Sequence, residues 1–227
     1  MVEYDKKENT KIAQNFKNIL NLDSEPVAIK FVLKPEEVPN DIEKIEEPLR
    51  HCEMVKLASK GKTFYASKDE EKCKGGSAAL GLEDLPPKIA SGEFYVNLGG
   101  FKDTESAKAT LNALPTMKVR NYGLLYAPLE TATFAPDVVV IFAKPVQAMK
   151  ISQAIIYELD DRVKADFAGI QSICADAVSK PASTGNANIT LGCNGSRKYA
   201  KLADDEVTVG LSTKNIEKIT EALIKLN

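Results

Sequence analysis

Four cysteines are the residues of this chain whose type and spacing could do chemistry. Cys52 and Cys73 lie 21 positions apart, and Cys174 and Cys193 lie 19 positions apart, so they form two matched pairs. Thiolates bind iron–sulfur clusters and structural zinc, and four of them complete a tetrahedral ligand set. If the two pairs meet at one place, the pattern predicts a single site with two ligands from each pair.

The two pairs have similar surroundings. Each follows a strand-like segment that ends in Lys-Pro, at 34–35 and at 144–145, and Cys73 and Cys193 are each followed by a glycine-containing step into a helix. Glycine lets the backbone come close, and free N–H groups at a helix start can then point at sulfur. Such N–H···S bonds stabilise a thiolate and tune the potential of a cluster. We expect this contribution from Gly75, Gly76, Gly192 and Gly195.

Two further side chains adjoin the cysteines. Arg197 follows Cys193 by four positions, and we expect its guanidinium to compensate the charge of a cluster or to hold a small anionic ligand. His51 precedes Cys52 and is the one histidine of the chain, which excludes a site with several histidine ligands. Consecutive helical residues point about 100° apart. We therefore expect His51 to be a surface or capping residue rather than the partner of a Cys–His nucleophile.

The spacing by itself leaves several interpretations of the cysteines open. No Cys-x-x-Cys occurs, whereas most ferredoxin-type clusters and structural zinc sites take two ligands from one tight turn. A [4Fe–4S] cluster, a zinc ion and ordinary buried thiols all fit the count, because free cysteine is among the most buried residue types. A redox disulfide and a catalytic thiol fit it as well.

Composition limits the class of protein. The 227 residues are 44% hydrophobic and 27% charged with a net charge of −2, so we expect no nucleic-acid partner. The N-terminal residues 1–6 are polar, unlike a signal peptide, and the longest strongly apolar run, 138–143, is too short to span a bilayer. We therefore expect a cytoplasmic protein that does not associate with a membrane. Thiols stay reduced in that compartment, so disulfides are not the default there.

Periodicity and capping residues predict the elements that position the cysteines. In the first part we expect helices at 9–21, 49–60 and 104–114, and strands at 26–33, 63–66 and 93–98. A turn at Ser67 is expected to start a helix with Asp69 and Glu70 in its first positions. In the second part we expect strands at 137–143, 187–191 and 206–211, and helices at 146–159, 171–180 and 213–226, with a turn into a short helix at 192–197.

The order of these elements is similar in the two parts of the chain. Lys-Pro, Cys and Cys-x-Gly recur in the same order, and 93–98 followed by 104–114 resembles 206–211 followed by 213–226. We predict an α+β protein, one two-lobed domain over 1–227, built from an internal duplication with a pseudo-two-fold axis. After the N-terminal helix 9–21, the first half would cover about 24–116 and the second about 134–227. Each half would read strand, helices, strand, Cys turn, helix, strand, helix.

Three segments also resemble a known family. HCEMVKLASKGKTFYASKDEEKCKGGSAALGL (51–82), PDVVVIFAKPVQAMKISQAI (136–155) and GCNGSRKYAKLADDEVTVGL (192–211) are similar to the uncharacterised family called domain of unknown function one-six-nine. The resemblance covers nearly the whole chain and implies a family found mainly in anaerobic archaea and bacteria. That setting favours oxygen-sensitive iron–sulfur chemistry. The resemblance implies no catalytic residue.

The leading hypothesis is an iron–sulfur protein that binds one [4Fe–4S] cluster through Cys52, Cys73, Cys174 and Cys193. It would transfer electrons or bind a ligand beside the cluster, with a redox protein and a small anionic ligand as partners. The alternative is a metal-free small-molecule enzyme or binding protein with a reactive cysteine. A structural zinc protein is the third hypothesis.

Overall fold

The computed structural model describes residues 6–158 and 162–227. One antiparallel sheet runs through the molecule in the order β2-β3-β1-β4-β6-β5. An antiparallel sheet combined with helices confirms the α+β class. The strands are β1 Val27–Val32, β2 Phe64–Ser67, β3 Gly123–Pro128, β4 Val138–Ala143, β5 Asn188–Thr190 and β6 Val207–Ser212.

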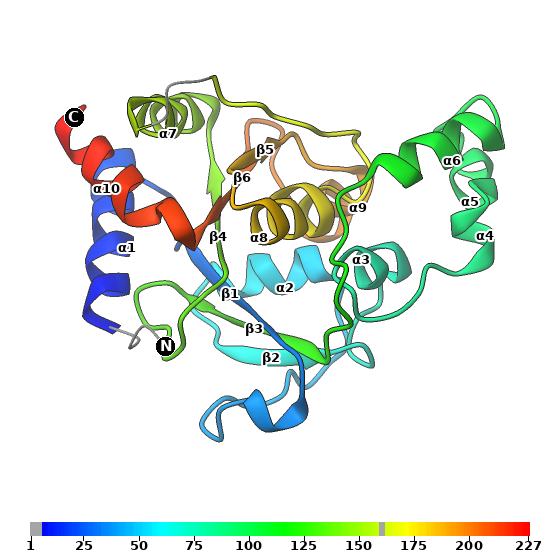
Figure 1. Ribbon diagram of the computed structural model, residues 1–227, viewed down its shortest axis with the longest axis horizontal. Coiled ribbons are helices and arrows are strands. Elements are labelled where there is room, and N and C mark those ends of the chain that lie inside the picture. Colours follow the sequence, from blue (N-terminus) through cyan, green and yellow to red (C-terminus); the bar gives the residue numbers. More distant parts are fainter. Residues whose placement is uncertain (1–5, 159–161) are drawn as a thin grey trace.

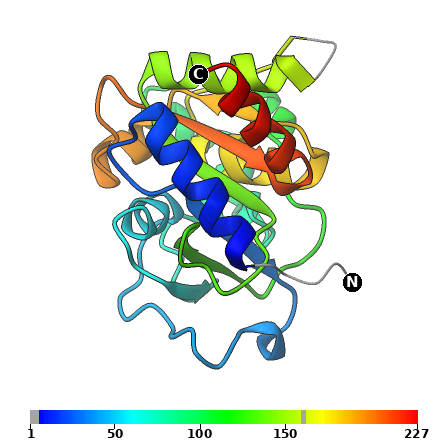
Figure 2. The same ribbon diagram turned by 90° about the vertical axis from the view of Figure 1, so that its left-hand side faces the viewer.

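Helices cover both faces of this sheet. Figures 1 and 2 show α1 (Lys6–Leu20), α7 (Pro145–Glu158) and α10 (Ile216–Lys225) on one face. The other face carries α2 (His51–Ala58), α3 (Lys74–Ala79), the π-helix η2 (Ser172–Ser179) that continues into α8 (Lys180–Thr184), and α9 (Asn194–Tyr199). Short 3-10 turns lie at Pro35–Glu37 (η1) and Thr213–Asn215 (η3).

Two hydrophobic cores follow from this layering. Ala28, Leu125 and Val139 point to the core under α1, α7 and α10. Their chain neighbours Val27, Leu124 and Val138 point to the core under α2, α3 and η2. Because both faces are covered, the strands β3 and β4 read as continuous apolar runs rather than as an alternating pattern.

Most predicted elements are confirmed, including the strand before each Lys-Pro and the helices that carry the cysteines. Gly61 ends the helix of Cys52 with φ of +102°, which suits glycine. The helix predicted at 146–159 is α7, and its last predicted residue, Leu159, lies outside the described residues.

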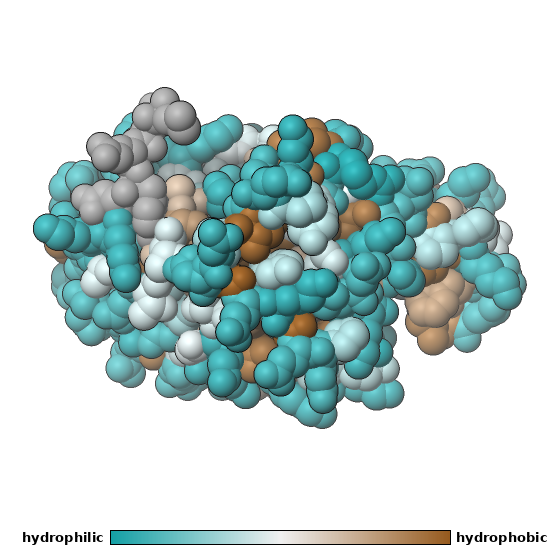
Figure 3. Space-filling model, turned by 90° about the horizontal axis from the view of Figure 1, so that it is seen from below, coloured by the Kyte–Doolittle hydropathy of each residue, from teal (hydrophilic) through white to brown (hydrophobic). Residues whose placement is uncertain are grey.

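The strand predicted at 93–98 is wrong. Residues Glu93–Asn97 form a short helix, α5, between α4 (Pro87–Ala90) and α6 (Thr104–Ala113). These three helices form an arm at the right of Figure 1, away from the sheet. Alternation over six residues cannot distinguish a strand from a helical turn. Figure 3 shows a hydrophobic patch on this arm, where Phe94 and Leu98 are exposed.

The helix predicted to start at Asp69 and Glu70 is also wrong. Residues 68–70 form a turn, and α3 begins at Lys74. The Glu70 carboxylate bends back to accept hydrogen bonds from the backbone N–H (2.9 Å) and hydroxyl (2.8 Å) of Ser67. Its side chain therefore closes a turn instead of capping a helix.

Strand β3 was not predicted, and it changes how the two halves compare. Read outward from the β1–β4 pair at the centre, the sheet order is β1-β3-β2 on one side and β4-β6-β5 on the other. The strand in the position equivalent to β6 is thus β3 and not 93–98. Helix α6 comes before β3 while α10 follows β6, so the predicted match of 104–114 with 213–226 fails in order. The internal duplication, with half boundaries near 116 and 134, stays a prediction.

No helix in the described parts of the chain is long and apolar enough to cross a bilayer.

Candidate functional site

Each of the four cysteines lies at the start of a helix on the same face of the sheet. Cys52 is the second residue of α2, and Cys174 is the third residue of η2. Cys73 and Cys193 are the residues immediately before α3 and α9. Because α2 contacts both η2 and α9, and α3 contacts η2, these helix starts belong to one region of the molecule.

The four thiols are electrostatic neighbours. The thiols of Cys193 and Cys73 both act on the pKa of Cys52, and Cys193 also acts on Cys73. Cys174 is affected by all three of the others. Every pair among the four therefore interacts, although the residues span positions 52 to 193. All four are free thiols.

Gly76 marks the point where two of the sulfur atoms approach each other. A Cβ on this residue would lie 3.5 Å from the Sγ of Cys73 and 3.6 Å from the Sγ of Cys174. The two sulfur atoms are therefore no more than about 7 Å apart. This limit is compatible with a [4Fe–4S] cluster, whose ligand sulfurs are separated by roughly 6–7 Å. The N–H of Gly76 also donates to the Sγ of Cys73 at 3.4 Å.

The other predicted glycines have different surroundings. A Cβ on Gly195 would lie 3.6 Å from the Sγ of Cys193, but the N–H that donates to this sulfur, at 3.4 Å, belongs to Ser196. Gly75 packs against the side chain of Gln171. Gly192 has φ of +88°, and a Cβ there would lie 2.6 Å from the side chain of Leu202. This position therefore requires glycine to form the turn before Cys193.

Arg197 is engaged in the loop around Cys193. Its guanidinium donates to the carbonyl oxygens of Leu191 (2.6 Å) and Glu206 (3.2 Å) and to that of Ala203. These hydrogen bonds connect the backbone on both sides of the loop around Cys193. The role predicted for Arg197 beside a cluster or an anionic ligand stays a prediction. The cation that favours the Cys73 thiolate is instead Arg50, the residue before α2, whose guanidinium stacks 3.4 Å from the ring centroid of Tyr199.

The prediction that His51 is a surface or capping residue is wrong, because the residue is buried and Arg50 caps α2. The side chain of His51 is 1% exposed, and its Nδ1 is 2.8 Å from the Tyr126 hydroxyl. Burial lowers the pKa of His51 to about 3, so the ring is neutral. The ring fills the core between α2 and the sheet, and its Nε2 is buried with no hydrogen-bond partner among the described residues.

Glu71 ties two of the cysteine-bearing turns together. One carboxylate oxygen accepts the backbone N–H of Cys73 at 2.7 Å and that of His51 at 3.1 Å. The residue is 4% exposed, and burial raises its pKa to about 8 despite these hydrogen bonds. Its other oxygen is buried with no hydrogen-bond partner in the described chain. Sequence reasoning missed this residue, because nothing in a Glu-x-Cys spacing indicates burial.

The four thiols differ in acidity. Burial raises the pKa of Cys52, Cys73 and Cys174. Burial also acts on Cys193, but hydrogen bonds from Ser172 and Ser196 outweigh it and lower the pKa of this thiol. Cys193 is therefore the thiol that ionises most readily.

Tyr95 and Gln171 complete the surroundings of the site. Gln171 is 7% exposed and donates from its Nε2 to the Tyr95 hydroxyl at 3.2 Å. Burial raises the pKa of Tyr95 to about 12, and the thiols of Cys174 and Cys73 contribute to the rise. Tyr95 lies on α5, so the arm contacts the segment just before η2, which carries Cys174. The wrong strand prediction at 93–98 gave no indication of this contact.

The geometry does not amount to a ready-made site for a metal ion. Within residues 6–158 and 162–227, no group of three or more histidine, cysteine, aspartate or glutamate side chains is arranged to hold one. The cysteines are near neighbours, and their side chains would have to turn toward a bound group to coordinate it.

Comparisons with known proteins agree with the resemblance. The family model of domain of unknown function one-six-nine, described as uncharacterised ArCR, matches residues 15–222. The chain is 42% identical over 213 residues to the uncharacterised protein MJ0308 of Methanocaldococcus jannaschii, covering 93% of this chain and 91% of that protein. No solved structure matches.

Proposed function

The chain belongs to domain of unknown function one-six-nine, and from that premise we propose that it is an iron–sulfur protein. Cys52, Cys73, Cys174 and Cys193 would bind one [4Fe–4S] cluster, two ligands from each part of the chain. The cluster would serve electron transfer to a partner protein, or the binding of a small ligand beside it. A reducing cytoplasm, which we also propose, would keep the thiols available.

The convergence of the thiols is the observation that carries this proposal. Four cysteines from distant positions gather at the starts of four helices, and each pair among them interacts. Cysteines used as ordinary core residues have no reason to collect in one place, because four neighbouring thiols bury no more apolar surface than four scattered ones. Four thiolates at one place are the donor set of a cluster.

The surroundings of Gly76 also support the proposal. Glycine at this position leaves room between the sulfur atoms of Cys73 and Cys174, where any other residue would place a Cβ. The N–H groups of Gly76 and Ser196 donate to the Sγ atoms of Cys73 and Cys193. Hydrogen bonds of this kind stabilise bound thiolate and tune a cluster's potential. When bound, the cluster would supply one-electron exchange.

A zinc ion is a weaker candidate. Zinc–sulfur bonds of roughly 2.3 Å in a tetrahedron require sulfur atoms about 3.8 Å apart. In the described chain no such close group is arranged for one ion, so zinc would demand the larger movement of the cysteines.

One observation favours a second function, that of a metal-free enzyme with a reactive cysteine. The thiol of Cys193 accepts hydrogen bonds from Ser172 and Ser196, which stabilise its thiolate, and the thiolate is the nucleophilic form. This function requires one exceptional thiol, whereas the cluster requires all four.

Anaerobic purification with iron and sulfide quantification tests the proposal. The expected result is brown protein with absorbance near about 400 nm and about four iron atoms per chain. Colourless, iron-free protein after anaerobic reconstitution, with Cys193 alkylated far faster than the other cysteines, would replace the cluster with the reactive-cysteine function.

A further inference from the structure

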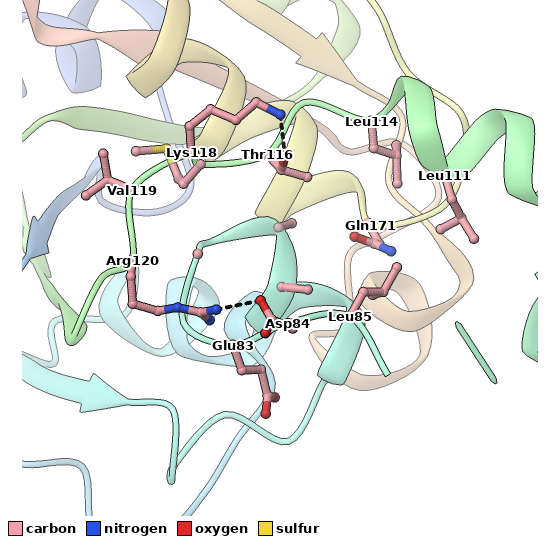
Figure 4. A pocket seen from close by; sticks show the side chains of 14 residues that line it. Glu83, Asp84, Leu85, Leu111, Leu114, Thr116, Lys118, Val119, Arg120 and Gln171 are labelled. Atoms are coloured by element: carbon pink, nitrogen blue, oxygen red, sulfur yellow. Dashed lines mark hydrogen bonds and ion pairs between the residues drawn. The ribbon is translucent and has the colours of Figure 1, made fainter. Parts of the chain in front are cut away.

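A cavity lies beside the cysteines, between α3, the end of α6 and the segment 116–120 that follows it (Figure 4). Its volume is about 410 Å³, within the range of small-molecule sites, roughly 300–1,000 Å³. Ala78 and Ala79 of α3 form one wall, and Gln171 contributes to another.

Gln171 connects this cavity to the cysteine site. Its side chain lines the cavity, while its Nε2 lies 3.0 Å from the position of a Cβ on Gly75, two residues after Cys73. It also donates to the hydroxyl of Tyr95. The backbone of Gln171 has φ of +47°, in the left-handed region that is unfavourable for a non-glycine residue. Such residues persist where the surrounding structure fixes them, often at binding sites.

The segment that carries the charges of the cavity is held in place at both ends. The N–H of Met117 donates to the carbonyl of Ala79, and the N–H of Asn121 donates to that of Gly81, each at 2.9 Å. Both acceptors lie at or just after the end of α3. The segment between them therefore presents Lys118 and Arg120 to the cavity from a fixed backbone.

Two acidic and two basic side chains line the cavity, and both carboxylates are engaged in ion pairs. The carboxylate of Glu83 pairs with Lys74 at 2.9 Å, and that of Asp84 pairs with Arg120 at 2.5 Å. Lys118 donates to a neutral group, the Thr116 hydroxyl, at 3.4 Å. Lys118 is therefore the lining cation that is paired with no carboxylate among the described residues.

The cavity has a polar and an apolar end. In Figure 4, Arg120, Asp84 and Glu83 lie on one side, whereas Leu85, Leu111 and Leu114 lie on the other, next to Gln171. Leu111 is buried and Leu114 half-buried, so an aliphatic group placed there would leave water. The apolar end is the one nearer to the cysteines.

We infer that this cavity binds a small organic anion with an aliphatic body. The anionic group would lie at Lys118, and the aliphatic body at Leu111 and Leu114, reaching toward Gln171. Binding by itself is independent of the cluster, while the role of such a ligand beside the cluster rests on the proposed function. A molecule in contact with Gln171 changes the surroundings of Gly75 and hence of Cys73.

Hexanoate is a suitable probe, because it combines a carboxylate with a short aliphatic chain. We expect calorimetric titration of the full chain without iron to show saturable binding with Kd of about 1 mM. Lys118→Met should weaken hexanoate about threefold to tenfold and leave the binding of uncharged 1-hexanol unchanged. The matched control is Lys88→Met, an exposed lysine on α4 outside the cavity, which should alter neither.

Absence of saturable hexanoate binding at about 20 mM would overturn the inference, as would equal weakening by the two lysine variants. A second measurement tests the link to the thiols: hexanoate should change the alkylation rate of Cys73 at least about twofold in the wild type and less in Lys118→Met. An unchanged rate in both would overturn the placement next to the cysteines. Because the titration uses iron-free protein, failure of iron binding leaves these results standing.

Discussion

The turns of Cys73 and Cys193 have the same local geometry and opposite chemistry. In both, the cysteine precedes a six-residue helix, and its Sγ accepts the N–H three residues later at 3.4 Å. Yet the pKa of Cys73 is raised and that of Cys193 is lowered. The local motif thus places a sulfur atom, but it does not set the acidity of the thiol.

Groups from other elements make the difference. After burial, the largest effects on Cys193 are hydrogen bonds from Ser172, at the start of η2. Cys73 instead lies near the carboxyl group of Glu71, which opposes ionisation of the thiol. Two turns of the same geometry whose thiols differ in pKa can hold one common site, or each cysteine can have a role of its own. Experiments can distinguish these two cases.

Removing either sulfur gives the largest expected effect. If both turns serve one cluster, Cys73→Ser and Cys193→Ser should each reduce iron from about four atoms per chain to less than about one, because a hydroxyl is a poor ligand for iron. Iron and sulfide are quantified after anaerobic reconstitution, with circular dichroism as the control for folding. If only one of the two variants loses iron while both fold, the two turns do not share one site.

Filling the space beside each sulfur sharpens the comparison. Gly76→Ala places a methyl group against the sulfur atoms of both Cys73 and Cys174, whereas Gly195→Ala meets only that of Cys193 among the sulfurs. We expect Gly76→Ala to lose most of its iron and Gly195→Ala to lose less. Both contacts exceed 3.4 Å, and alanine is favoured over glycine in a helix by up to about 1 kcal/mol, so neither variant should lower Tm.

Equal iron in Gly76→Ala and wild type would show that the space at Gly76 is not used by the cluster.

The alkylation rates of the two thiols in iron-free protein allow the two turns to be compared in the absence of metal. In iron-free protein at pH 7, iodoacetamide should alkylate Cys193 at least about tenfold faster than Cys73, since the thiolate is the nucleophile. Ser172→Ala should slow Cys193 several-fold by removing a donor to its thiolate. The rates come from mass spectrometry of the modified peptides, with Ser183→Ala, on α8, as the matched control. Equal rates at the two cysteines would refute the difference in acidity.

Substitution of Glu71 has the smallest expected effect at pH 7, measured as the alkylation rate of Cys73. The direction in which this effect changes with pH follows from the pKa of Glu71. Burial raises the pKa of Glu71 to about 8, so the carboxyl is mostly protonated at pH 7 and mostly charged at pH 9. Glu71→Gln should therefore change the alkylation rate of Cys73 by less than about twofold at pH 7 and accelerate it several-fold at pH 9. A larger effect at pH 7 than at pH 9 would contradict the raised pKa.

Much of the site could be predicted from the sequence because its signals are local. The Lys-Pro ends of β1 and β4, and the glycines around Cys73 and Cys193, correctly placed strands and helix starts. Segment 93–98 failed because six alternating residues fit both a strand and a helical turn. Strand β3 was missed because its apolar run, GLLYAP, lacks the β-branched residues that mark the equally buried β4, VVVIFA, as a strand.

The sequence by itself determined four thiols, their pairing by spacing and the helix starts that hold them, since capping and turn chemistry act over a few residues. Only the tertiary structure decided that the four thiols are neighbours, that Glu71 and His51 are buried beside them, and that Ser172, distant in sequence, helps to acidify Cys193. Burial and charge depend on which distant segments pack together, and a pattern along the chain does not contain that information.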